Sequence, residues 1–131
     1  MPFKASSVLV AKAILLFERR VNKVKIDCIG DTVIIRPSGE LDHHYAAEIR
    51  EKADSIIHKG GVRKVIFDFT NIGFMDSSGI GVIMGRYRLM EAVGGTVCAF
   101  GAGKRVMSLI EMSGLKRLIK VYKNEQQAME V

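Results

Sequence analysis

The sequence predicts a single α/β domain built on a mixed β-sheet, and three observations carry this prediction. Short β-branched and apolar runs alternate along the chain with segments whose apolar residues recur at helical spacing. Glycine pairs at 60–61 and 94–95 separate these segments. The chain has 131 residues, of which 48% are hydrophobic, so it can bury one core without disulfide or metal crosslinks.

Two strands joined by a tight turn open the predicted domain. Val24, Ile26 and Cys28 alternate with charged residues, a pattern typical of a half-buried strand. Gly30-Asp31 is a hairpin-type turn, and residues 32–36 form the returning strand.

Helical segments then alternate with strands. The first follows Asp42, a suitable N-cap, and the second begins at the serines after strand 63–69. A third helix follows strand 96–100, and residues 118–122 predict a last strand at the edge of the sheet. The expected core-facing stripes are Tyr45, Ile49, Ala53, Ile56 and Ile57 in the first helix, Ile80, Ile83, Met84, Tyr87 and Met90 in the second, and Val106 and Ile110 in the third.

A short helix is expected at the C-terminal end. Asn124 and Gln127 have the spacing of a capping box, in which each side chain bonds a backbone N–H at the helix start. The complete predicted order is β-β-α-β-α-β-α-β-α, which indicates an α/β fold with a mixed sheet.

The net charge of +6 is concentrated near the N-terminus. Residues 1–25 hold six basic side chains and one acidic side chain, so the rest of the chain carries only +1. In that remainder basic and acidic residues are interleaved, and no platform combines aromatic with basic residues. We therefore expect no direct binding of nucleic acid.

Residues 1–22 form an N-terminal extension ahead of the predicted domain, 23–131. Their apolar run, 5–17, is shorter than the roughly 20 residues that a membrane-spanning helix needs, and Lys12 interrupts it. A signal peptide is disfavoured because charged residues 18–20 stand where a cleavage site would need small ones. We favour an accessory or non-native tail, and a peripheral membrane helix is the open alternative.

The motifs of common enzymes are absent. Gly101 and Gly103 lack the third glycine of a dinucleotide fingerprint, and Met75 stands where a serine-hydrolase elbow needs glycine. Three histidines and two cysteines show no metal-ligand spacing, and we expect Cys28 and Cys98 to be buried free thiols in a reducing compartment. The sequence therefore predicts a protein that is not an enzyme and that uses no cofactor or metal.

The stretch 74–81 is the point around which the chain is organised. It places Asp76, Ser77 and Ser78 at a helix start, where backbone N–H groups and the helix dipole favour negative charge. Two interpretations are open, a plain helix cap and a phosphorylatable switch. Residue chemistry alone does not choose between the two serines.

Several motifs, taken in order, resemble the STAS domain family and, within it, the anti-sigma-F factor antagonists of endospore-forming bacteria. The resemblance covers roughly residues 23–130 and implies a mixed sheet of four to five strands with about four helices. Its motifs are Gly39-Glu40-Leu41-Asp42-His43-His44, Phe74-Met75-Asp76-Ser77-Ser78-Gly79, Gly85-Arg86-Tyr87, Met112-Ser113-Gly114-Leu115 and Glu125-Gln126-Gln127-Ala128.

The resemblance also implies a function. Ser77 would be the regulated phosphorylation site of a cytoplasmic anti-anti-sigma factor. The unphosphorylated protein would bind a nucleotide-bound anti-sigma factor that is also a serine kinase, and so release a sporulation sigma factor. Phosphorylation by that kinase would inactivate it, and a metal-dependent serine phosphatase would restore it.

The predicted partner surface surrounds the serine loop. The resemblance assigns Asp42 to it, and the helix face that begins at Ser77 extends it, although a solvated helix face is the alternative. The expected partner-binding residues are Asp42, Asp76, Ser77, Ser78, Gly81, Gly85 and Arg88. The second hypothesis for the function is a STAS signalling module of another complex, either nucleotide-sensing or membrane-associated.

Overall fold

The computed structural model describes residues 8–12 and 24–130. Residues 8–12 form a short helical segment, and most of the predicted extension, 1–22, lies outside the described residues. The domain boundary at residue 23 therefore stays a prediction. Within the described residues, every helix is too short or too polar to cross a membrane.

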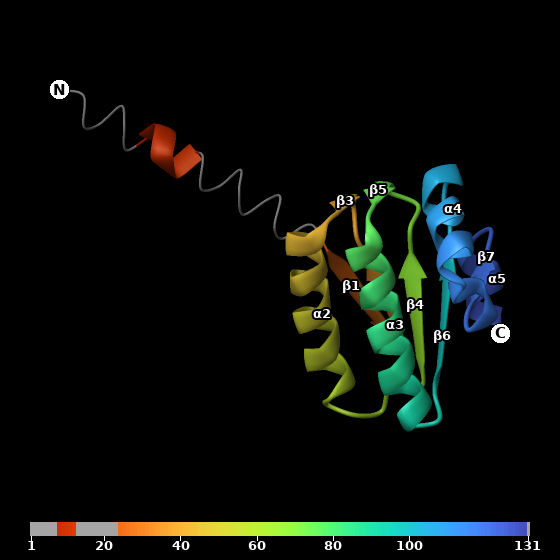
Figure 1. Cartoon of the computed structure of the whole chain (residues 1–131). Coiled ribbons are helices and arrows are strands. Elements are labelled where there is room, and N and C mark those ends of the chain that lie inside the picture. Colours follow the sequence, from red (N-terminus) through yellow and green to blue (C-terminus); the bar gives the residue numbers. More distant parts are fainter. Residues whose placement is uncertain (1–7, 13–23, 131) are drawn as a thin grey trace.

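A five-stranded mixed sheet forms the centre of the domain (Figure 1). Its first two strands are antiparallel, as expected for a hairpin, and each later neighbour is parallel. The strand order is β1-β2-β4-β6-β7, with β1 at Lys25–Ile29, β2 at Thr32–Arg36, β4 at Lys64–Asp68, β6 at Thr96–Phe100 and β7 at Lys120–Tyr122.

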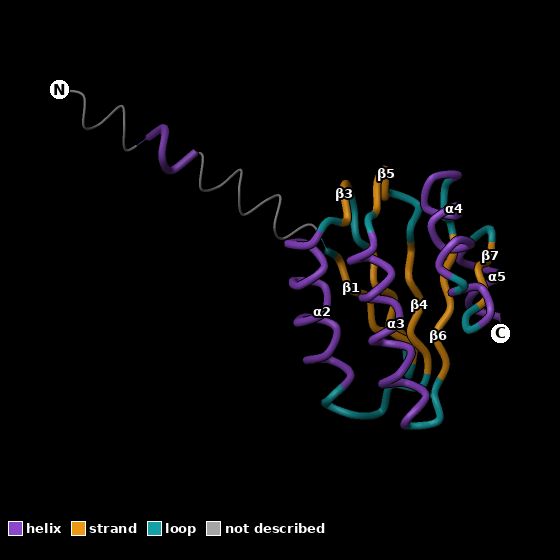
Figure 2. The backbone as a smooth tube through the Cα atoms, viewed as in Figure 1, coloured by secondary structure: helices purple, strands orange, loops and turns teal. Residues whose placement is uncertain are grey.

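Four α-helices of the described residues 24–130 pack on this sheet (Figure 2). Three of them, α2, α3 and α4, cover one face, and the short α5 covers part of the other. The predicted fold class is thereby confirmed. The helices are α2 at His43–Ile57, α3 at Ser77–Ala92, α4 at Lys104–Ser113 and α5 at Glu125–Glu130, with a 3-10 turn, η1, at Leu115–Arg117.

Because side chains alternate along the strands, the hydrophobic core is divided between the two faces of the sheet. In β2, Val33 and Ile35 face the main core under the three helices, whereas Ile34 faces the smaller core under α5. Cys98 lies in that smaller core, and Cys28 on β1 is exposed. Both are free thiols, as predicted, but the expected burial is wrong for Cys28, because β1 is an outermost strand of the sheet.

The sequence-based prediction missed two short strands. β3, Gly39–Leu41, and β5, Ile72–Met75, pair in parallel as a separate two-stranded sheet. Both segments were expected to be connections, because three or four residues are too few to show a periodicity. The predicted edge strand 118–122 is shorter than expected, because Leu118 ends the 3-10 turn η1.

The buried face of α3 is rotated from the predicted stripe. Ile83 and Met90 are buried as expected, but Ile80, Met84 and Tyr87 are only partly buried. Ile56 on α2 is likewise only partly buried. The buried face includes one charged residue, and the buried residues of α3 are Gly79, Val82, Ile83, Arg86 and Met90.

The C-terminal helix begins as predicted, with one difference. Asn124 Oδ1 accepts a hydrogen bond from the backbone N–H of Gln127 at 2.9 Å. Gln127 Oε1 reaches back to the N–H of Lys123, at 3.1 Å, one residue before the expected donor.

Candidate functional site

The β3–β5 ribbon brings the two conspicuous acidic residues of the sequence to the same edge of the fold. Leu41 of β3 pairs with Met75 of β5, and Asp42 and Asp76 are the residues that directly follow these two strands. The N–H of Asp76 donates to the carbonyl of Leu41 at 3.3 Å. Two helices, α2 and α3, therefore begin side by side at the same level (Figure 1).

Each aspartate caps its helix. Asp42 Oδ1 accepts from the N–H of Tyr45 at 2.9 Å, and Asp76 Oδ1 accepts from the N–H of Ser78 at 2.8 Å. Both residues have extended backbone, as N-cap residues do. The helix starts thus combine oriented N–H groups with two half-buried carboxylates. The predicted capping role of Asp42 is confirmed.

The two serines of the loop differ in accessibility. Ser77 is exposed, whereas Ser78 is half-buried and its N–H is bonded to the Asp76 carboxylate. Ser77 is the first residue of α3, immediately after the N-cap. Its hydroxyl is therefore the one that an enzyme approaching from solvent reaches more readily.

The glycines of α3 fall into two kinds. A Cβ built on Gly79 would collide with Cγ and Sδ of Met75, so close packing against β5 requires glycine there. A Cβ on Gly81 or Gly85 would meet nothing within 4 Å. Packing within the domain thus explains Gly79 but neither of the other two. Arg88, one turn further along, is exposed.

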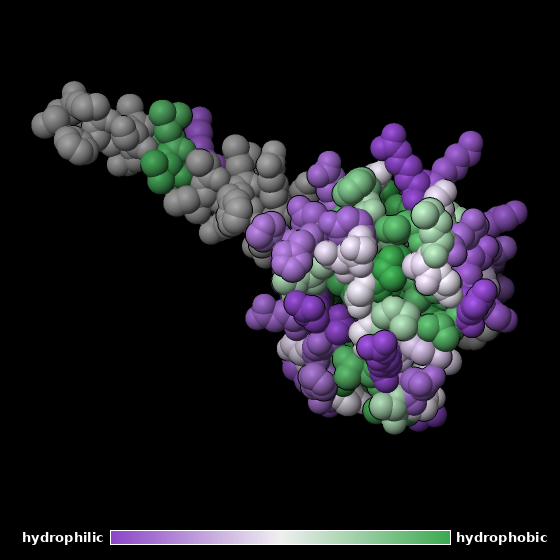
Figure 3. Space-filling view, viewed as in Figure 1, coloured by the Kyte–Doolittle hydropathy of each residue, from purple (hydrophilic) through white to green (hydrophobic). Residues whose placement is uncertain are grey.

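The molecular surface around α3 is less polar than its surroundings. In Figure 3, apolar and weakly polar side chains gather along the middle of the face that carries α3, and strongly hydrophilic ones flank them. Phe74 on β5 is 45% exposed, only three residues before Ser77. Every predicted partner residue therefore lies on α3 or at the shared start of α2 and α3.

A buried arginine belongs to the same helix pair and was not predicted. Arg86 is 4% exposed, and it forms an ion pair with Asp54 of α2. The sequence offered one signal, an arginine on the side of the helix adjoining the apolar stripe. Hydropathy patterns assign such a residue to solvent, and so the pair was missed.

Among the described residues, no group of three His, Cys, Asp or Glu side chains is arranged to hold a metal ion. The polar groups of the site are two carboxylates, two hydroxyls and the N–H groups of helix starts. This chemistry can accept a phosphoryl group on an exposed hydroxyl and can present hydrogen-bonding groups to a protein partner.

A family model for the STAS domain matches residues 23–128. The chain therefore belongs to the STAS domain family. An anti-sigma F factor antagonist from Paenibacillus polymyxa is 39% identical over 97 residues, which are 74% of this chain and 83% of the relative. The resemblance to anti-sigma-F factor antagonists is confirmed.

Two solved structures of one anti-sigma factor antagonist, SpoIIAA, have the same fold. The unphosphorylated form is 35% identical with a TM-score of 0.75, and the alignment covers 82% of this chain and 93% of that one. The phosphorylated form of the Bacillus protein is 34% identical with a TM-score of 0.68, covering 82% and 96%. These relatives are regulators of sigma factors, so the chain is similar to regulatory proteins.

Proposed function

We propose that this protein is a cytoplasmic anti-anti-sigma factor that a single phosphorylation on Ser77 switches off. In the unphosphorylated form it binds a nucleotide-bound anti-sigma factor with serine kinase activity, and a sporulation sigma factor is released. A metal-dependent serine phosphatase reverses the modification. The protein acts by binding, with no enzymatic reaction of its own and no contact with nucleic acid.

The single observation that carries the proposal is the position of Ser77. It is exposed at the first turn of α3, between the Asp76 cap and the face of α3 that carries Gly81 and Gly85 (the glycine face), and beside the Asp42 cap of α2. Exposure supports Ser77 over Ser78 as the modified residue. SpoIIAA, a relative at 34–35% identity, has been solved in both an unphosphorylated and a phosphorylated form.

Electrostatics give the switch its strength. A phosphoryl group adds about −1.5 to −2 charges at neutral pH. Within the domain this charge is tolerated, because the helix N-terminus faces it. Across a protein interface it adds to Asp42 and Asp76, and like charges there cost several kcal/mol. Since about 1.4 kcal/mol is a factor of ten in affinity, one phosphate can abolish binding without refolding the domain.

The glycine face of α3 supports its assignment to the partner interface. Glycine in a helix interior costs roughly 1 kcal/mol relative to alanine, and the domain has room for alanine at Gly81 and Gly85. A flat helix surface lets a partner approach the backbone closely. Arg88 on the same helix can pair with an acidic group of the partner.

The test is intact-mass analysis after incubation with ATP and the cognate anti-sigma kinase. The wild type and Ser78→Ala should gain one phosphoryl group, and Ser77→Ala should gain none. Binding of the kinase to the unmodified protein, measured by calorimetry, should be lost in the phosphorylated one. An active kinase that leaves the wild type unmodified would favour the alternative, a STAS module of another assembly.

A further inference from the structure

Strand β1 is an open edge of the sheet. Among the described residues, Lys25–Ile29 pairs only with β2. In an antiparallel pair, every second residue of an edge strand directs its N–H and C=O groups away from its neighbour. These groups can pair with an added strand.

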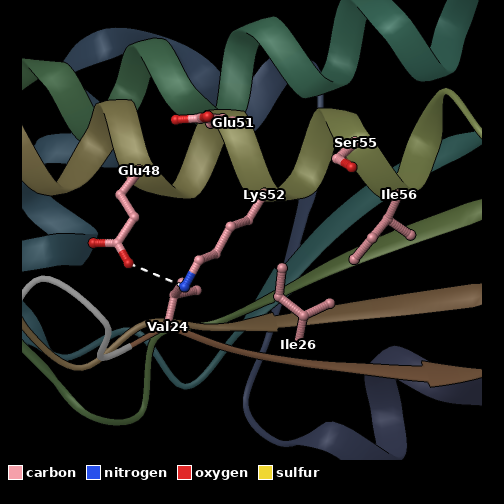
Figure 4. A pocket seen from close by; sticks show the side chains of 7 residues that line it. All are labelled: Val24, Ile26, Glu48, Glu51, Lys52, Ser55 and Ile56. Atoms are coloured by element: carbon pink, nitrogen blue, oxygen red, sulfur yellow. Dashed lines mark ion pairs between the residues drawn. The ribbon is translucent and has the colours of Figure 1, made fainter. Parts of the chain in front are cut away.

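A pocket lies directly beside this edge, between β1 and α2 (Figure 4). Its volume is about 610 Å³, within the range of sites that hold ligands. Val24 and Ile26 line it from the strand side, and Ser55 and Ile56 line it from the helix. An open strand edge with a helix-bounded pocket is the arrangement by which several domains bind extended peptides.

The helix wall of the pocket carries two carboxylates, Glu48 and Glu51, against one ammonium, Lys52, and the carboxylate of Glu48 is incompletely bonded. The Glu48 side chain is only 11% exposed, and its Oε1 lies 3.1 Å from Nζ of Lys52. Its Oε2 is buried and accepts no hydrogen bond from the described part of the chain. A buried carboxylate oxygen without a donor is costly, so a ligand that supplies an N–H there is favoured. Glu51, exposed at the rim, adds a second negative charge.

We propose that the groove between β1 and α2 binds an extended peptide segment of a partner protein, which adds to β1 as a new strand. Its groove-facing residues, every second one, combine aliphatic side chains with lysine or arginine. Val24 and Ile26 are two residues apart, so they match the side-chain repeat of an added strand. The aliphatic groups pack on these two residues, and the cations pair with Glu48 and Glu51. The groove does not include Ser77 or its loop.

The test uses the full chain and the capped peptide acetyl-Lys-Thr-Val-Thr-Lys-Thr-Val-amide as the probe. Cys28 reports on β1 because it is exposed, and buried Cys98 serves as the internal reference. We expect the peptide to slow the alkylation of Cys28 in a saturable way and to increase the protection of β1 from hydrogen exchange. Replacing both lysines of the peptide by glutamate should abolish the protection, since this removes the cations.

Two protein variants locate the site. Glu51→Lys should weaken peptide binding about tenfold or more, whereas Glu130→Lys, an equal change of charge on α5, should leave it within about twofold. Absence of binding at 1 mM peptide, roughly the weakest affinity of a specific contact, would overturn the proposal, as would equal binding of the glutamate peptide. Protection, without peptide, of the β1 N–H groups that do not bond to β2 would also overturn it. If that protection rises with protein concentration the occupant is a second copy, and otherwise it is the chain itself.

Discussion

Arg86 of α3 and Asp54 of α2 form a buried ion pair, with Nε of the arginine 2.9 Å from Oδ1 of the aspartate. The arginine side chain is 5% exposed and the aspartate 24%. Burial lowers the pKa of the Arg86 guanidinium, and the charge of Asp54 opposes that effect. The pair joins the two helices whose N-termini carry the Asp42 and Asp76 caps. It therefore fixes the relative position of the two halves of the proposed partner surface.

Removing the charge of Asp54 from this pair should destabilise the domain more than removing Arg86. Asp54→Asn leaves the arginine buried without a counter-charge, and we expect a loss of about 3 kcal/mol in the free energy of unfolding. Arg86→Met fills the same space with an apolar chain and leaves Asp54, whose side chain is 24% exposed although its Oδ1 is buried. The loss in the free energy of unfolding should therefore be smaller for Arg86→Met than for Asp54→Asn. Urea denaturation measures both, with Arg88→Met as the exposed control; an equal loss for the two variants would contradict the explanation.

The glycines of α3 provide a matched pair of substitutions. Gly79→Ala forces a Cβ into Met75 and should destabilise the domain by about 1–3 kcal/mol. Gly81→Ala meets no atom and should stabilise it by roughly 1 kcal/mol through helix propensity.

The same pair separates stability from binding. If the glycine face belongs to the interface, Gly81→Ala should bind the anti-sigma kinase more weakly although the domain is more stable. Denaturation and calorimetry on one preparation decide this, and a bulky residue at Gly85 extends the test. Unchanged kinase affinity in both variants would show that this face is merely solvated.

The fold was largely predictable from sequence, whereas the geometry of the site was not. Five-residue strands such as 96–100 and capped helices leave local signals, and the Asp42 and Asn124 caps were identified from residue type and spacing. The ribbon that brings Asp42 beside Asp76 depends on a pairing between segments more than thirty residues apart. No hydrophobic periodicity in the sequence indicates such a pairing. The buried Arg86 was missed because its partner is distant in sequence.

The Asp42 cap allows charge to be separated from helix capping. Asp42→Ala removes the acceptor for the Tyr45 N–H and should cost about 1 kcal/mol of stability. Asp42→Ser retains an N-cap oxygen, so its stability should stay close to that of the wild type. If the carboxylate contacts the kinase, both variants should lose affinity to a similar extent. Kinase affinity that follows stability instead, lost in Asp42→Ala and kept in Asp42→Ser, would assign Asp42 to capping alone.

Acid should weaken the contact between β1 and Arg36 of β2 before it unfolds the rest of the domain. Arg36 at the end of β2 contacts three carboxylates: Asp27 at 2.7 Å, Asp68 at 3.0 Å and Glu125 of α5 at 2.5 Å. The hydrogen bond to Glu125 is the main cause that raises the pKa of Arg36, and the hydrogen bond from Arg36 lowers the pKa of Asp27. The arginine thus stays charged, and Asp27 is the partner whose pKa its hydrogen bond lowers.

The direction of the pH effect follows from the lowered pKa of Asp27. A carboxylate whose pKa is lower in the folded state contributes stability at pH values above its unfolded pKa, about 4, and loses it as the pH falls through the folded pKa. We expect hydrogen exchange to show faster opening of β1, which carries Asp27, as the pH drops below about 4, after correction for intrinsic exchange. Arg36→Met should remove most of this pH dependence, and because it also removes the partner of Glu125 it should open α5 at neutral pH. Alkylation of Cys98, which lies beneath Ala128, provides a second measurement at neutral pH and should accelerate in this variant. An α5 that stays protected in Arg36→Met would mean that the small core under the helix holds it without the charges.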